Sequence, residues 1–82
     1  MTVTDAPEAA ITAYVCRLAG RQVEPHEAII SSQLLESIAA VQLIDFIERS
    51  FAVVVDDEDL VLANFDSVDA IVALVRAKSG AT

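Results

Sequence analysis

Apolar residues recur every three or four positions in three separate segments of this chain, and this spacing restricts the fold more than any other feature. Side chains at such a spacing lie on one face of an α-helix. We expect long helices at residues 5–19, 37–51 and 66–79, and a shorter helix at 57–62. Each long helix has an apolar stripe that its neighbours must cover. The sequence therefore predicts an all-α fold, a small four-helix bundle, as one domain over residues 1–82.

Residues with known preferences for helix ends lie at the expected boundaries. Asp5 and Glu8 have the spacing of a capping box at the start of the first helix, and Gly20 suits the position just after its end. Asp66 is the expected N-cap of the last helix, which Gly80 would close. These signals sharpen the predicted helix limits.

Two connecting segments lack helical periodicity. Residues 21–36 form a long loop for a domain of this size, and we interpret residues 21–28 as a plain connector. Residues 52–55 are rich in valine but have no second strand to pair with, so we expect an extended connector. The loop contains four apolar residues that could hold it against the core: Ile29, Ile30, Leu34 and Leu35.

The charge balance excludes some partners. The formal net charge is -8, from 13 acidic and 5 basic residues, so the chain lacks the clustered cations that bind nucleic acid. The same charge favours steering towards basic protein partners. We see no secretory signal, and the longest apolar run, residues 70–75, is too short to cross a membrane. We therefore expect a cytoplasmic protein that binds neither nucleic acid nor membrane.

Side chains for catalysis or metal binding are few. Cys16 is the only cysteine and His26 the only histidine, and no pattern suggests a group that orients them. We interpret them as a partly buried structural thiol and a solvated loop residue, with a small thiol enzyme as an alternative. The acids at residues 56–59 lack the glycine and glutamate spacing of a calcium-binding loop. We interpret them as a solvated helix start, with a general cation surface as the alternative.

The second predicted helix begins at a serine, Ser37, where unpaired N–H groups and the helix dipole favour an anion. A helical wheel gathers Ala39, Leu43, Phe46, Ile47 and Phe51 on one side. The other side carries Ser37 together with Ile38, Val41, Asp45 and Glu48. This apolar and acidic face indicates a docking surface beside the serine. Alternatively, Ser37 is an ordinary N-cap.

These residues resemble those of a known family. Leu34-Leu35-Glu36-Ser37-Ile38, followed by Val41, Leu43, Phe46, Glu48 and Phe51, resembles the acyl carrier and peptidyl carrier proteins. Their hallmark is Asp-Ser-Leu at the start of the second helix of a four-helix bundle. The stretches at residues 57–60 and 64–68 also look like these carriers, and the similarity extends from the first helix to about Lys78.

The resemblance implies a role for Ser37. Its hydroxyl would receive 4′-phosphopantetheine from coenzyme A through a separate phosphopantetheinyl transferase. An acyl- or aminoacyl-activating ligase would load the arm with a thioester-bound cargo, and an acyltransferase or condensing enzymes would use it. The carrier itself, expected to be a monomer, would catalyse nothing. The candidate partner contacts are Leu35, Glu36, Ile38, Val41, Asp45 and Glu48.

A second acid-serine-aliphatic sequence, Asp66-Ser67-Val68, competes for the role of modification site. Only 15 residues follow Ser67, enough for one helix, whereas 45 follow Ser37. We therefore interpret Ser67 as part of the capped start of the last helix and assign the modification to Ser37.

The chain also departs from the family pattern. Glu36 stands in place of the usual Asp and Ile38 in place of the usual Leu, and the longer acid is a poorer helix cap. The second helix is less acidic than is common in fatty-acid carriers, with Ala39, Gln42 and Arg49 where acids are frequent. This pattern favours a free-standing carrier of polyketide, nonribosomal peptide or D-alanyl type.

Overall fold

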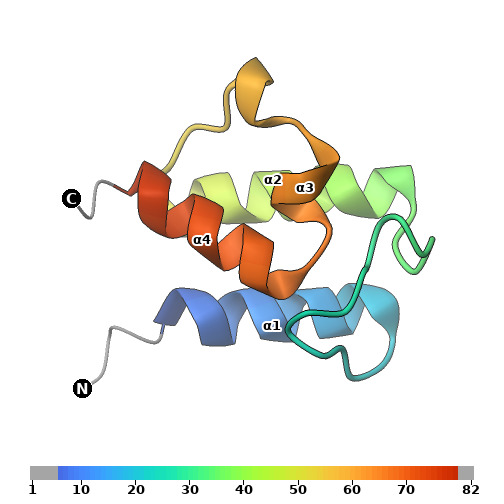
Figure 1. The fold of residues 1–82 in the computed structure, drawn as a ribbon. Coiled ribbons are helices and arrows are strands. Elements are labelled where there is room, and N and C mark those ends of the chain that lie inside the picture. Colours follow the sequence, from blue (N-terminus) through green and yellow to red (C-terminus); the bar gives the residue numbers. More distant parts are fainter. Residues whose placement is uncertain (1–5, 80–82) are drawn as a thin grey trace.

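Helices account for the regular structure of residues 6–79, the part of the chain that the computed structural model describes (Figure 1). These residues contain no strand, and the fold is an all-α four-helix bundle, as the apolar spacing predicts. The elements in chain order are α1 (Ala6–Ala19), α2 (Ser37–Phe51), a 3₁₀ turn η2 (Asp57–Asp59), α3 (Leu62–Phe65) and α4 (Val68–Lys78).

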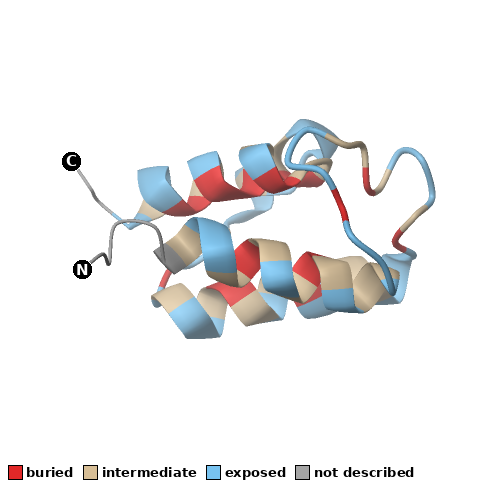
Figure 2. Ribbon diagram, turned by 90° about the horizontal axis from the view of Figure 1, so that it is seen from below, coloured by how far each residue is buried: buried red, intermediate tan, exposed pale blue. Residues whose placement is uncertain are grey.

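Helix α1 packs against both α4 and α2, and α3 packs against α4. In Figure 1, α4 lies between α1 and α2 in the view, and η2 stands out above them. Buried residues lie on the sides of the helices that face one another (Figure 2). The largest fully buried side chains come from α1, α2, α4 and the long loop: Ile11, Val15, Ile29, Leu43, Ile47, Val68, Ile71 and Val75.

The ends of α1 and α2 agree closely with the sequence prediction. Gly20 follows α1 with a φ of 76°, a left-handed conformation that favours glycine, and its N–H donates to the Cys16 carbonyl at 2.8 Å. Helix α2 covers the predicted residues 37–51. The proposed cap at Asp5 and the closing residue Gly80 lie outside the described residues.

The contact between α1 and α2 includes an aromatic pair. The rings of Tyr14 and Phe46 stack with centroids 4.1 Å apart and planes 6° apart. Phe51 meets the ring of Phe46 edge-on at 6.1 Å. Arg17 lies over the Tyr14 ring, with its guanidinium carbon 6.0 Å from the centroid. Aromatic contacts of this kind add to the free energy gained from area burial.

The loop between α1 and α2 is anchored in the core along its length. Ile29 and Leu35 are buried, and Ile30 and Leu34 are half-buried against the core, as their apolar character predicts. Val23 is also buried, so the expectation of a plain connector at residues 21–28 was wrong at this position. A single valine in a polar stretch gave no periodic signal of its burial.

The region between α2 and α4 differs from the prediction. The expected helix at 57–62 is two elements, the 3₁₀ turn η2 and the later helix α3. The Asp56 and Asp59 side chains form a capping box at the start of this single turn, and Lys78 binds both carboxylates. Phe65, which is buried, anchors α3 to the core. The connector predicted at residues 52–55 contains no helix or strand, but its first residue, Ala52, is left-handed rather than extended, with a φ of 56°.

Helix α4 begins later than expected and has a different cap. Ser67 is the N-cap, and its Oγ accepts a hydrogen bond from the Ala70 N–H at 3.1 Å. The prediction of Asp66 as the cap was therefore wrong. The Asp66 side chain instead binds the long loop, where it accepts a bond from the Ile30 N–H. A distant partner thus competes successfully with the local capping preference of an aspartate.

Candidate functional site

The start of α2 is a helix N-terminus without a side-chain cap. Glu36 occupies the N-cap position with extended backbone angles, and its carboxylate makes no capping hydrogen bond. Its carbonyl accepts the first helical bond, from the Ala40 N–H at 3.0 Å. Ser37 is the first helical residue and is exposed, so it is not the N-cap. The N–H groups of the first turn therefore remain available to an anion at this end.

The serine hydroxyls differ in whether they are already used. Ser31 donates to Asp66, Ser32 donates to the Ala28 carbonyl, Ser67 caps α4 and Ser79 donates to the Arg76 carbonyl. Neither Ser37 nor Ser50 uses its hydroxyl in a hydrogen bond within residues 6–79.

These two serines lie at opposite ends of the same helix. Ser50 is near the C-terminal end of α2, where the helix dipole disfavours a negative group, whereas Ser37 is at the favourable end. Ser37 is thus the exposed, uncommitted serine best placed to carry a phosphate ester.

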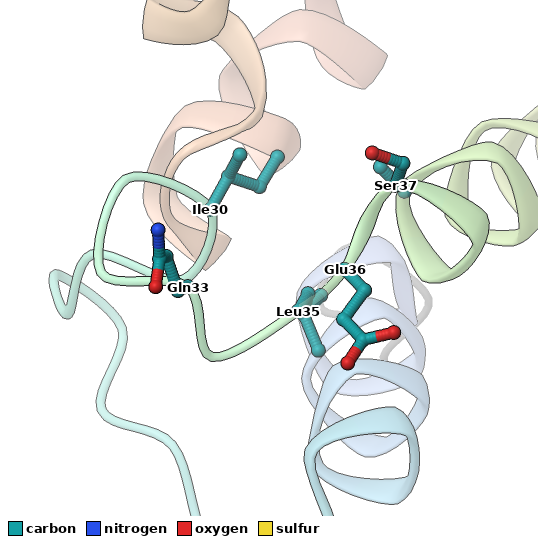
Figure 3. Close-up of a pocket in the computed structure, with 6 residues that line it drawn as sticks. Ile30, Gln33, Leu35, Glu36 and Ser37 are labelled. Carbon is teal, nitrogen blue, oxygen red and sulfur yellow. The ribbon is translucent and has the colours of Figure 1, made fainter.

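A hollow of about 560 Å³ lies beside Ser37. In Figure 3 the Ser37 hydroxyl and the Glu36 carboxylate point to different sides of the chain, so the acid does not lie over the hydroxyl. The hollow is lined by Ile30, Gln33, Leu35, Glu36, Ser37 and Ala40.

A second hollow, of about 210 Å³ and almost wholly apolar, shares Ile30 and Ala40 with the first. Its lining also includes residues in and just before α3: Leu60, Val61, Leu62 and Phe65. A group attached at Ser37 therefore has both a mixed and an apolar surface within its immediate surroundings.

The predicted partner contacts fall into different environments. Ile38 and Val41 are 72% and 65% exposed, and Glu36 is also exposed. Asp45 is exposed but forms an ion pair with Arg49, one helical turn later, at 3.0 Å. The surface beside Ser37 is therefore more apolar than the residue types alone suggest.

The other two predicted contacts have structural roles. Leu35 is only 4% exposed and belongs to the core, so its side chain offers little surface to a partner. Glu48 is half-buried, and its Oε2 accepts a hydrogen bond from the Val55 N–H at 2.9 Å, which holds the chain after α2. The wheel placed Glu48 on the outer face but could not show this return of the chain.

The residues that hold the segment before Ser37 were not identified from the sequence. The Asp66 carboxylate accepts hydrogen bonds from the N–H groups of Ile30 and Ser31, both at 2.8 Å, and from the Ser31 hydroxyl at 2.7 Å. Bonds from the Ser31 backbone and hydroxyl, followed by those from Ile30 and Ile29, lower the pKa of Asp66 below its ordinary value of 3.8. Ser31 and Ile30 lie 35 and 36 residues from Asp66 in sequence, and no local pattern indicates their contact.

The other candidate chemical groups are not assembled into a site. Cys16 is half-buried, with its thiol 3.7 Å from the Gln22 side-chain oxygen, and His26 is exposed in the loop. In the described part of the chain, no three His, Cys, Asp or Glu side chains are grouped so that they could hold a metal ion. Among the acids at residues 56–59, Asp56 and Asp59 are bound to Lys78.

Comparisons with known proteins give no assignment, because no family model and no curated protein matches this chain. None of the helices in residues 6–79 is long and apolar enough to span a bilayer. The geometry at Ser37 and the motif that surrounds it are therefore the observations that bear on function.

Proposed function

We propose that this chain is an acyl or aminoacyl carrier protein in which Ser37 is modified with 4′-phosphopantetheine. One observation carries the proposal: the Ser37 hydroxyl is exposed and uncommitted at the uncapped start of a long helix. The resemblance of residues 34–51 to the carrier motif indicates that the modification is 4′-phosphopantetheine. The helix N-terminus supplies a physical reason for stabilising a phosphodiester there.

In this proposal the reaction is performed by a separate transferase. The Ser37 oxygen forms a bond to the phosphorus that bears the pantetheine of coenzyme A, the adenosine bisphosphate leaves, and the hydroxyl proton passes to a base of the transferase. The thiol of the attached arm then holds the cargo as a thioester. The chain's own contribution is to present Ser37 and to offer a surface to partners.

The surface beside Ser37 supports a role in docking. Ile38 and Val41 expose apolar area next to the hydroxyl, and the chain as a whole carries a net charge of -8. A partner with an apolar contact region and a basic rim would match both features. The reduced acidity of α2 favours the enzymes of polyketide, nonribosomal peptide or D-alanyl transfer systems over those of fatty-acid synthesis.

Intact-protein mass spectrometry tests the proposal. The protein is incubated with coenzyme A and a broad-specificity phosphopantetheinyl transferase, and we expect a gain of one phosphopantetheine group. Ser37→Ala should abolish the gain, and Ser50→Ala, the matched change at the other uncommitted serine, should retain it. No gain in the unsubstituted protein, or a gain that persists in Ser37→Ala, would refute the carrier function and leave the unmodified interaction domain as the alternative.

A further inference from the structure

Ser37 follows a segment, residues 29–35, that has no regular secondary structure but is held together by hydrogen bonds between its own residues. The Leu35 N–H donates to the Ile29 carbonyl at 2.8 Å, and both side chains are buried. Between them, the Gln33 N–H donates to the Ile30 carbonyl at 2.9 Å, and Gln33 has a φ of 66°. A non-glycine residue seldom adopts this left-handed conformation unless its surroundings hold it there. The position of residues 29–31 therefore determines where the chain enters α2.

Asp66 is the residue that fixes residues 29–31. In addition to the three hydrogen bonds at its carboxylate, its main-chain carbonyl accepts a bond from the Ile29 N–H at 2.9 Å. The adjacent residues hold Asp66 in turn, because Phe65 is buried and Ser67 caps α4. Asp66 thus joins the junction of α3 and α4 to the segment that presents Ser37.

Helix capping does not account for this arrangement, because Ser67 performs that function. We propose that Asp66 is a positioning residue for modification at Ser37, acting through the closed segment of residues 29–35. This inference rests on the proposed carrier function. Without the carboxylate, only a fraction of the molecules hold the segment in the arrangement that the transferase binds. The apparent KM then rises by the inverse of that fraction, while kcat of the bound complex changes little.

The experiment measures KM and kcat of the transferase for the unsubstituted protein and for Asp66→Ala, with coenzyme A as the donor. We expect KM to rise about tenfold in Asp66→Ala. A rise of this size corresponds to about one molecule in ten holding the segment in the arrangement that the transferase binds. Asp66→Asn should remain within about twofold, because its amide oxygen can still accept the two N–H bonds. Unchanged KM in Asp66→Ala overturns the inference, as does a loss in Asp66→Asn equal to that in Asp66→Ala.

Two controls separate positioning from other effects. Asp69→Ala removes an exposed acid of the same charge from the first turn of α4, and it should leave KM unchanged. Ile71→Val weakens the core of α4 but removes no group that hydrogen-bonds with Asp66 or with residues 29–35, and it should also leave KM unchanged. A similar rise in KM in either control shows that charge or general stability is responsible, and this overturns the inference.

Amide hydrogen exchange supplies a readout that needs no transferase. In Asp66→Ala, the amides of Ile30, Ser31 and Leu35 should exchange faster than in Asp69→Ala, while those in α1 should not. If the unsubstituted protein is not modified at all, the proposed function fails. In that event, faster exchange in this segment still supports control of the Ser37 position by Asp66, and unchanged exchange overturns it.

Discussion

Lys78 Nζ lies 2.6 Å from Oδ2 of Asp59 and 3.0 Å from Oδ2 of Asp56, so the last turn of α4 is bound to the 3₁₀ turn η2. The hydrogen bonds to Asp59 and Asp56 raise the pKa of Lys78, and the bond from Lys78, followed by that from the Asp56 N–H, lowers the pKa of Asp59. The bridge is therefore fully formed between the ordinary pKa values, 3.8 for Asp59 and 10.5 for Lys78.

This bridge predicts the effect of removing the ammonium group. Lys78→Met keeps most of the aliphatic stem, and we expect it to speed amide exchange at Asp59 and Leu60 and to lower Tm slightly. Lys78→Arg, which keeps a cation, should preserve the exchange rates. Unchanged exchange in Lys78→Met would show that the capping box alone holds η2.

The uncapped start of α2 predicts a stabilising substitution. Glu36→Asp places a shorter carboxylate at the N-cap, where it can accept a bond from an N–H of the first turn. We expect the free energy of unfolding to increase by about 1 kcal/mol, the usual worth of a good cap. Chemical denaturation measures this change. Glu36→Gln tests whether charge is the cause, and an equal gain there would contradict the capping explanation.

The two faces of α2 predict opposite responses to truncation. Ile47 is fully buried, and Ile47→Ala should lower the free energy of unfolding by about 2–5 kcal/mol through lost burial and a cavity. Ile38, on the same helix, is 72% exposed, and Ile38→Ala should change it by less than about 0.5 kcal/mol. Urea denaturation compares the two, and similar losses would contradict the assignment of the faces.

The exposure of Ile38 and Val41 has a second consequence under the proposed function. If this surface contacts the transferase, Ile38→Ser, which replaces the aliphatic side chain with a small polar one, should lower kcat/KM for modification about tenfold. This is the effect expected from the loss of one buried aliphatic contact. Val54→Ser is a matched control, because Val54 is 68% exposed but lies beyond the C-terminal end of α2. An equal loss in both variants would exclude a specific contact at Ile38.

The depressed pKa of Asp66 predicts the pH dependence of its contribution. Because the folded-state pKa lies below the ordinary 3.8, the stability that the charged form provides is fully present above pH 3.8. It is lost as the pH falls through the folded-state pKa. We expect the difference in unfolding free energy between the unsubstituted protein and Asp66→Asn to diminish below pH 3.8. A difference that is independent of pH down to 2 would contradict this account.

The long helices and much of the core follow from the sequence because their apolar residues repeat with the helical period. Both ends of α2 and the burial of Leu43 and Ile47 belong to this class. The position of Ser37 at the start of α2 also follows from local pattern. Whether Ser37 was itself the N-cap stayed open on the sequence, because a serine suits that position better than the preceding Glu36 does.

The remaining features depend on contacts between distant residues. Asp66 has a good local role as an N-cap, but the N–H groups of Ile30 and Ser31 offer it more partners. The acids at residues 56–59 suit a helix start, but they form a single 3₁₀ turn, and Asp56 and Asp59 bind Lys78. In both cases the partner lies in another part of the chain, where single-residue preferences carry no information.

The stacked rings of Tyr14 and Phe46 have a practical consequence. The chain has one tyrosine, no tryptophan and three weakly emitting phenylalanines, so Tyr14 dominates its ultraviolet emission. Tyr14 lies at the contact between α1 and α2, with its ring centroid 4.1 Å from that of Phe46. The emission of Tyr14 can therefore be used, without an added label, to follow separation of α1 from α2, the helix that begins at Ser37.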